Sequence, residues 1–318
     1  MTRSLLAALL CAGLSLQPAT AQDESAPVEP RPSAMASLAA EALLLDAVLL
    51  DDYAIAVGAF GHILRIDARL SWAQSPSPVS MQLTAVDFVD DRRGWVVGHD
   101  AAILTTDDGG LSWTLQHFAP ELEQPLFDVC FIDASRGFAV GAYGLMLRTD
   151  DGGASWGEVA ISDDEFADSH LNGIVRAGEA LIVVGERGTV YRSPDLGDTW
   201  TGVDFPYDGS MFGAIVTQSG RVIAFGLRGH VFASDDAGAS WAEISPEGSV
   251  SLNGGRVLAD GRVVLVGMSG VVLISADDGE SFTRLRDPVG DALAGVFEFD
   301  DGGTVLIGAS GFRDFPLP

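Results

Sequence analysis

Four stretches of the chain repeat an acidic, glycine-rich pattern of the kind that can hold a metal ion: TTDDGGLSW, RTDDGGASW, RSPDLGDTW and ASDDAGASW. Carboxylates beside glycines are the groups from which calcium loops are built. A calcium loop, however, supplies about six to eight oxygen ligands from ~12 residues that end in a glutamate. Each stretch here offers two carboxylates and then a tryptophan. We therefore expect no metal at these turns, and a structural role instead.

Residues for other catalytic chemistry are sparse. All 18 basic residues are arginine, so Schiff-base and P-loop lysine chemistry are excluded. The five histidines are scattered without metal-ligand spacing, and no nucleophile-elbow motif is present. The sequence thus predicts no catalytic residue, no metal and no cofactor.

The charge of the chain limits its partners. The formal net charge is −27 and the pI is about 4.2. A nucleic-acid binder needs a basic surface, and an anionic membrane would repel this protein. We expect no nucleic acid and no membrane insertion after export.

The N-terminus has the features of a secretory signal peptide. Arg3 precedes a short apolar run, and an Ala-x-Ala site predicts cleavage between Ala21 and Gln22, so residues 1–21 are assigned to the signal. A lipid anchor on Cys11 is the alternative. Residues 22–35 are rich in Pro, Ser, Ala and Glu and predict a flexible leader. The protein is thus expected in the periplasm or outside the cell, with Cys130 as a buried, unpaired thiol.

The spacing of the acidic turns indicates the elements that carry them. Successive turn-ending aromatic residues from Trp72 to Phe282 lie 41, 43, 44, 41 and 41 residues apart. Three β-rich runs precede each turn and a fourth follows it, and this pattern occurs in seven copies. A period of about forty residues with four short strands is typical of a β-propeller blade. The sequence predicts one all-β domain over residues 36–318, a seven-bladed propeller with four-stranded blades.

The last copy lacks its acidic turn and its fourth strand. A propeller closes its ring or leaves an exposed edge. We expect residues 36–45, ASLAAEALLL, to add the missing strand to the last blade. The alternative is a short Ala/Leu-rich helix on the outside, which local propensity favours.

The acidic turn joins the third and fourth strands of its blade. Its Asp is expected to accept backbone N–H groups, its Gly to supply a positive φ, and its aromatic residue to pack between blades. The residues assigned to these roles are Asp108, Gly110, Trp113, Asp151, Gly153, Trp156, Asp195, Gly197, Trp200, Asp236, Gly238, Trp241, Asp277, Gly279 and Phe282.

The turn resembles the Asp-box, or bacterial-neuraminidase repeat, which occurs in sialidases and in non-enzymatic propellers. The longer unit, with GWVVG before an Asp-box, resembles the photosystem II assembly and stability factor family over about residues 43–315. The resemblance implies a seven-bladed, non-enzymatic propeller, here of a type found in non-photosynthetic bacteria. A sialidase would require three converging arginines and a Tyr–Glu pair, for which only four tyrosines are available.

The turns between strands two and three form the expected partner-binding face, opposite the Asp-boxes. Their Gly-x-x-Gly pattern keeps the backbone constant while two side chains vary. The candidate partner-binding residues are Phe60, His99, Asp100, Tyr143, Glu186, Arg187, Arg228 and Met268. The family resemblance adds a possible arginine patch of Arg65, Arg148 and Arg192, with Thr105 replacing Arg in the second repeat.

Taken together, these features predict a non-catalytic, exported, monomeric propeller. Its partner would be a protein, and its role that of an assembly or accessory factor for a membrane or envelope complex. The alternative is a carbohydrate-binding or sialidase-like propeller, for which the loop FPYDGSMF is the best sugar-stacking candidate.

Overall fold

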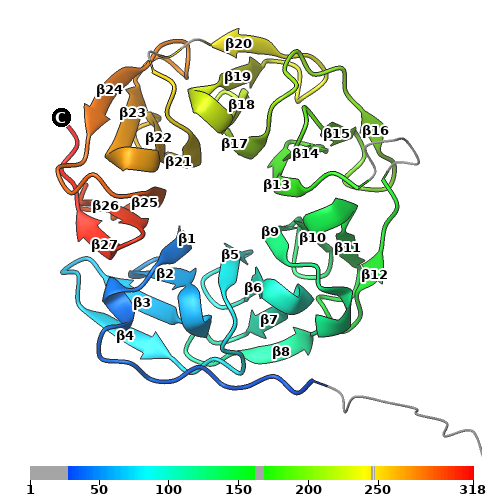
Figure 1. Ribbon diagram of the computed structural model, residues 1–318, viewed down its shortest axis with the longest axis vertical. Coiled ribbons are helices and arrows are strands. Elements are labelled where there is room, and N and C mark those ends of the chain that lie inside the picture. Colours follow the sequence, from blue (N-terminus) through cyan, green and yellow to red (C-terminus); the bar gives the residue numbers. More distant parts are fainter. Residues whose placement is uncertain (1–27, 162–167, 245, 247) are drawn as a thin grey trace, which may run out of the picture.

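The computed structural model describes residues 28–161, 168–244, 246 and 248–318. The predicted signal peptide, residues 1–21, lies outside the described residues, as do residues 22–27 of the predicted leader. Seven antiparallel sheets surround a central axis, each with its first strand innermost (Figure 1). The predicted all-β, seven-bladed propeller is confirmed.

Each of the first three blades has four strands. Blade 1 contains β1 (Leu44–Leu49), β2 (Tyr53–Gly58), β3 (Ile63–Asp67) and β4 (Trp72–Ser75). Blade 2 contains β5 (Leu83–Phe88), β6 (Gly94–Gly98), β7 (Ile103–Thr106) and β8 (Thr114–His117). Blade 3 contains β9 (Leu126–Phe131), β10 (Gly137–Gly141), β11 (Met146–Thr149) and β12 (Gly157–Glu158).

The remaining blades repeat this order, except that the last has three strands. Blade 4 contains β13 (Leu171–Ala177), β14 (Ala180–Gly185), β15 (Val190–Ser193) and β16 (Thr201–Gly202). Blade 5 contains β17 (Met211–Val216), β18 (Val222–Gly226), β19 (Val231–Ser234) and β20 (Ala242–Ile244). Blade 6 contains β21 (Leu252–Val257), β22 (Val263–Gly267), β23 (Val271–Ser275) and β24 (Thr283–Arg286). Blade 7 contains β25 (Leu293–Glu298), β26 (Thr304–Gly308) and β27 (Gly311–Asp314).

The helices of the described residues are short 3₁₀ turns: η1 (Ala39–Glu41), η2 (Ala59–Gly61), η3 (His99–Ala101), η4 (Pro120–Leu122), η5 (Ala142–Gly144), η6 (Leu227–Gly229) and η7 (Met268–Gly270). Within this described part of the chain, none is long and apolar enough to cross a membrane.

The second strand of each blade is the centre of the core. β6, β10, β18 and β22 are buried at every position, because both faces of these middle strands pack against neighbouring blades. The closing glycine of this strand pairs with the first residue of the inner strand, as Gly58 does with Leu44. A Cβ on Gly58 would lie 2.0 Å from the carbonyl oxygen of Leu43. This close approach explains the glycine-bounded runs.

The predicted closing strand over residues 36–45 is wrong. No strand pairs with the outer edge of β27 in the described residues, and blade 7 keeps three strands. The segment instead forms η1, with Ala39 fully buried in the core shared by blades 1 and 7. A Cβ on Gly311 would lie 1.7 Å from the carbonyl oxygen of Ala40. Short alanine side chains and this glycine allow the turn to pack against the blade without strand pairing.

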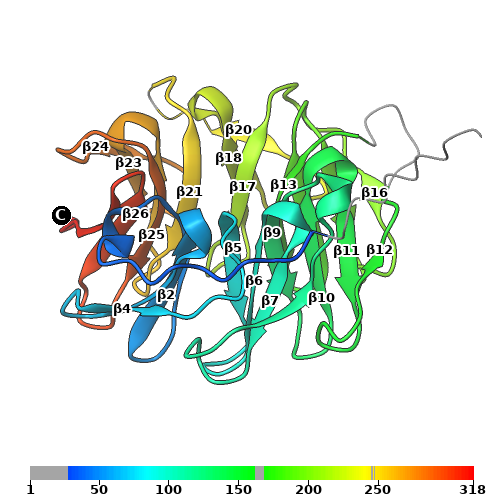
Figure 2. The ribbon, with the colours of Figure 1, turned by 60° about the horizontal axis from the view of Figure 1, so that its bottom comes forward.

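The described part of the predicted leader lies along the outside of blades 1 and 2 (Figure 2). The N–H of Ser33 donates to the carbonyl of Ser77 at 3.0 Å. The amide of Gln74 donates to the carbonyl of Ala34 and accepts from the N–H of Ala36. Residues 33–36 are therefore hydrogen-bonded to the propeller.

Candidate partner-binding face

The two faces of the disk carry different sets of turns. Asp-box turns lie beside the turns between strands one and two: the N–H of Gly152 donates to the carbonyl of Ser135 at 2.7 Å. The Gly-x-x-Gly turns lie beside the blade-to-blade loops: the N–H of Gly144 donates to the carbonyl of Ser169 at 3.0 Å. The predicted separation of an Asp-box face from a Gly-x-x-Gly face is confirmed.

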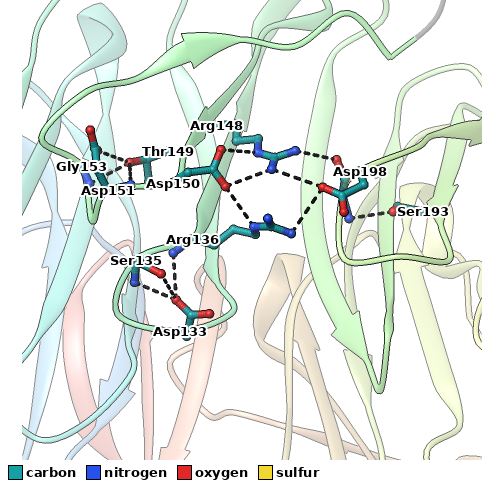
Figure 3. Close-up of polar contacts among 11 residues, drawn as sticks. Asp133, Ser135, Arg136, Arg148, Thr149, Asp150, Asp151, Gly153, Ser193 and Asp198 are labelled. Atoms are coloured by element: carbon teal, nitrogen blue, oxygen red, sulfur yellow. Dashed lines mark hydrogen bonds and ion pairs between the residues drawn. The ribbon is translucent and has the colours of Figure 1, made fainter.

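Each Asp-box turn is held by its own side chains. In blade 3 the hydroxyl of Ser155 donates to Asp151 at 2.6 Å, and the hydroxyl of Thr149 donates to the same carboxylate at 2.8 Å. The N–H of Gly153 donates to the Thr149 hydroxyl (Figure 3). The Ser155 hydrogen bond is the largest cause that lowers the pKa of Asp151 to about 2. The carboxylate is saturated by the turn, and no cluster of His, Cys, Asp or Glu among the described residues is arranged to hold a metal.

The Asp-box also contacts the preceding blade. Each aromatic residue from Trp113 to Phe282 packs in a core that its own blade shares with the one before. Turn carbonyls accept hydrogen bonds from that blade as well: Gln116 donates to Gly152 at 3.1 Å, and Ser75 donates to Gly110 at 2.5 Å. The turns are thus part of the seams between blades.

The arginines of the implied patch make similar contacts. Arg148 pairs with Asp150 at 2.8 Å and with Asp198 of the next blade at 3.2 Å, and it donates to the carbonyl of Gly197 (Figure 3). Arg136 pairs with the same two carboxylates. These arginines join blades 3 and 4.

The other two arginines lie apart from this cluster. Arg192 donates to the carbonyl of Ala237 in blade 5 at 2.7 Å. The guanidinium of Arg65 lies 4.1 Å from the ring centre of Tyr53 within blade 1. Each of the three arginines therefore contacts its own or the next blade.

The Gly-x-x-Gly face presents a ring of side chains in an unusual backbone conformation. The second variable residue of six turns has a φ between 54° and 60°, although none of these residues is glycine. They are Phe60, Asp100, Tyr143, Arg187, Arg228 and Ser269. A left-handed conformation costs a non-glycine residue roughly 1–2 kcal/mol. The conformation directs the side chain outward: Phe60 is 67% exposed and Tyr143 is 59% exposed.

The other predicted rim residues differ in their surroundings. His99 and Met268 are exposed, the latter by 45%. Glu186 lies 4.0 Å from the His170 ring nitrogen, and Arg187 pairs with Asp168 at 2.8 Å. Arg228 is exposed, and its guanidinium has no ion pair among the described residues.

Repeat alignment missed the residues that support this rim. The ring of His170 lies 4.8 Å from that of Tyr143, and its Nδ1 accepts the N–H of Tyr143 at 3.0 Å. Beside Phe60, residues 32–38 contribute Pro32, Ala34 and Leu38 to an apolar hollow. Both features come from segments that do not repeat, so spacing carried no signal for them.

Among the described residues, the four tyrosines lie apart from one another and form no sialidase-like set. The hydroxyl of Tyr53 donates to Gly109 on the Asp-box side, Tyr143 lies on the rim, and Tyr191 is buried. Tyr207, the sugar-stacking candidate, is stacked on His230 with ring centres 4.2 Å apart. One face of its ring is therefore already covered.

Three carboxylates in the central channel were also missed. Asp46, Asp87 and Asp128 each accept a backbone N–H from the next blade, at 2.9, 2.6 and 2.8 Å. They are enclosed by protein and their accessible surface faces the channel. Desolvation by burial raises their pKa values to about 6, 7 and 8. Their spacing of 41 residues was a signal that repeat alignment could have given.

The fold and the turns define the class: the protein is a seven-bladed β-propeller with Asp-box turns. The family model described as photosynthesis system II assembly factor YCF48 matches residues 65–124 and 116–270. The chain belongs to this family. No curated protein matches it.

Solved structures support the fold. A structure titled "YCF48 bound to D1 peptide" has 20% identity and a TM-score of 0.70, with 92% of this chain and 99% of that chain covered. YCF48 from Cyanidioschyzon merolae has 18% identity and a TM-score of 0.66, covering 88% and 97%. A virginiamycin B lyase from Staphylococcus aureus has 12% identity and a TM-score of 0.75, covering 91% and 99%. A YCF48 protein and a lyase thus share this architecture.

Proposed function

We propose that this protein is a non-catalytic assembly or accessory factor that binds a protein partner on its Gly-x-x-Gly face. The observation that carries the proposal is the ring of left-handed, non-glycine residues on that face. Backbone strain persists where the surrounding structure imposes it, and it is concentrated at functional sites. Here the strain recurs in six blades while the exposed side chain changes from aromatic to charged to polar.

The composition of the rim suits a protein partner. Aromatic and arginine side chains are the residue types that contribute most to protein interfaces. Phe60, Tyr143 and Met268 supply exposed apolar surface, and Arg228 supplies an exposed cation in an acidic chain. Family membership and the D1-peptide complex of a YCF48 protein support the same reading.

We further propose that the protein acts after export, in the periplasm or outside the cell, on a membrane or envelope complex, and as a monomer. The apolar run and Ala-x-Ala site before Gln22 support export. N-terminal sequencing of the protein from its native host tests this step. A mature chain that begins at Gln22 is expected, and a chain that retains residues 1–21 would contradict export by cleavage.

Affinity capture from the host envelope, read by mass spectrometry, tests the binding face. The variants Phe60→Ser, Tyr143→Ser and Arg228→Glu are expected to lose a specific membrane-complex subunit while their melting temperatures stay unchanged. Leu111→Ser is the matched control, because Leu111 is 54% exposed but lies on the Asp-box face. The proposed binding face would be contradicted if only Leu111→Ser lost the subunit, or if all three rim variants retained it.

A further inference from the structure

A hollow of about 400 Å³ lies on the propeller axis, where the inner strands meet. Its wall on the Gly-x-x-Gly side combines apolar and polar side chains. At this level each inner strand contributes the residue that follows the partner of a Gly-x-x-Gly glycine: Leu45, Thr84, Phe127, Asn172, Phe212, Asn253 and Ala294. The two phenylalanines are the largest apolar groups among them.

A single cation, Arg256 on β21, lies in the lining of this hollow. Its Nη1 donates to the carbonyl of Ala47 at 3.2 Å, across the axis from blade 6 to blade 1. No carboxylate in the described part of the chain forms an ion pair with it, and burial lowers its pKa. A guanidinium has five N–H donors in a planar fork. Most of that capacity is left for a planar acceptor such as a carboxylate.

Glycines form part of the wall of the hollow on blades 5 to 7. They are Gly213, Gly254, Gly255 and Gly295. A Cβ on Gly254 would lie 1.9 Å from the carbonyl oxygen of Ala294, and one on Gly255 would lie 2.6 Å from Leu265 Cδ2. Close packing of the strands therefore requires these glycines, so the wall at these positions is backbone.

The three channel aspartates leave this cation available. Each already accepts a backbone N–H from the next blade, and none lies within ion-pair distance of Arg256. Raised pKa values leave Asp87 and Asp128 partly protonated near neutral pH. β1, β5 and β9 contribute Asp46, Asp87 and Asp128, and the other inner strands contribute no titratable group to the lining besides Arg256.

We propose that the channel binds a carboxylate carried on an apolar body. The carboxylate pairs with Arg256, and the apolar part lies against Phe127 and Phe212. A monoanionic carboxylate suits the site better than a phosphate dianion, because Asp46 lies close enough to Arg256 to interact with its charge. The carboxylate belongs either to a small free acid or to the end of a peptide chain. This inference rests on the channel alone and is independent of the proposed partner face.

Isothermal titration calorimetry of the purified protein tests the proposal. The probes are 4-phenylbutyrate, its neutral amide, inorganic phosphate, and N-acetyl-Leu-Phe with a free or amidated C-terminus. We expect the free acids to bind and the amides to bind at least about tenfold more weakly, as loss of a charge-assisted pair implies. Arg256→Gln is expected to weaken the acids by about ten- to a hundredfold. Arg69→Gln, a change at an exposed arginine outside the hollow, is expected to bind them as the original protein does.

Several results would overturn the proposal: equal binding of acid and amide, stronger binding of phosphate, no binding of any acid, or unchanged affinity in a folded Arg256→Gln variant. If that variant does not fold, the pH dependence of acid binding by the unmodified protein tests the proposal instead. Affinity for the acid is expected to fall from pH 6 to pH 9 as Asp46, Asp87 and Asp128 ionise. A flat profile would contradict the proposal. Binding of only the small acid or only the peptide acid would identify the source of the carboxylate.

Discussion

Gly197, in the Asp-box of blade 4, lies directly against the ring of Phe138 in blade 3: a Cβ on Gly197 would be 2.1 Å from Cζ of that ring. The same relationship holds at other boxes, where the Cβ would lie 2.5 Å from Ile182 at Gly238 and 2.3 Å from Ile223 at Gly279. The glycine therefore serves two purposes. It allows the positive φ of the turn, and it lets the preceding blade approach.

The variant Gly197→Ala is expected to destabilise the protein more than a positive φ alone would. The φ of +89° costs roughly 1–2 kcal/mol in a non-glycine residue. Overpacking against the fully buried Phe138 ring adds about 1–3 kcal/mol. Urea unfolding followed by circular dichroism measures the total.

Gly220 is the matched control for this substitution. Its φ is +90°, and a Cβ there would meet nothing within 4 Å. Gly220→Ala should therefore show the backbone cost alone. Equal losses in the two variants would mean that the contact with Phe138 contributes nothing.

The period of the repeats was enough to predict the blade number, the strand order and the position of the tryptophans between blades. The acidic turn was expected to join strands three and four, and the contacts of its glycine show that it also forms part of the seam with the preceding blade. Its contact with the preceding blade was not predictable, because the partners differ in type: Ile55, Gln116, Phe138, Ile182 and Ile223. Repeat spacing identifies a residue type that recurs in every blade. The residues that meet the glycines at this seam differ in type and match them only in shape.

The tryptophans are expected to differ in their contributions to stability. Trp113 is 7% exposed, whereas Trp156 is only partly buried. Trp113→Ala should cost about 3–5 kcal/mol, as full removal of a buried aromatic ring does. Trp156→Ala should cost less. Urea unfolding of the two variants checks the order, and a larger loss for Trp156→Ala would contradict the burial argument.

The closing of the ring could not be read from local sequence. Residues 36–45 favour helix by composition, and ring closure favours a strand. In the structure the segment adds no strand to blade 7, and its helical part is only the three-residue 3₁₀ turn η1, which packs on β27. The channel was missed for a similar reason. Arg256 and Ala47 are 209 residues apart, and only the closed ring brings them together.

Arg148 provides a test of whether the implied arginine patch holds blades together or binds a partner. Arg148→Met removes the contacts with Asp150, Asp198 and the Gly197 carbonyl. Because these groups are partly exposed, we expect a loss of roughly 1 kcal/mol that shrinks at high salt. Arg69→Met is the control, since the Arg69 side chain has no ion pair among the described residues. Loss of partner capture with unchanged stability would instead assign Arg148 to binding.

The pH dependence of folding should have two limbs of opposite sign. The Asp-box carboxylates have pKa values lowered to about 2, so their contribution is present above the ordinary value of 3.8 and is lost as the pH falls toward 2. Asp87 and Asp128 have pKa values raised to about 7 and 8. Their contribution is fully present below 3.8 and is lost as the pH rises through 7 and 8. Stability should therefore be greatest in mildly acidic solution.

The alkaline limb can be assigned with one substitution. Asp128→Asn keeps an oxygen that can accept the N–H of Ile174 but cannot ionise. The unfolding free energy of the unmodified protein should fall between about pH 4 and pH 8, by at most about 1.4 kcal/mol per pH unit for each group. In Asp128→Asn this fall should be smaller, even if the variant is less stable at pH 5 through loss of the second acceptor. Asp46 and Asp87 still titrate in the variant, so a remaining slope is expected. An unchanged slope would show that Asp128 does not titrate in this range and that its hydrogen bonds outweigh its desolvation.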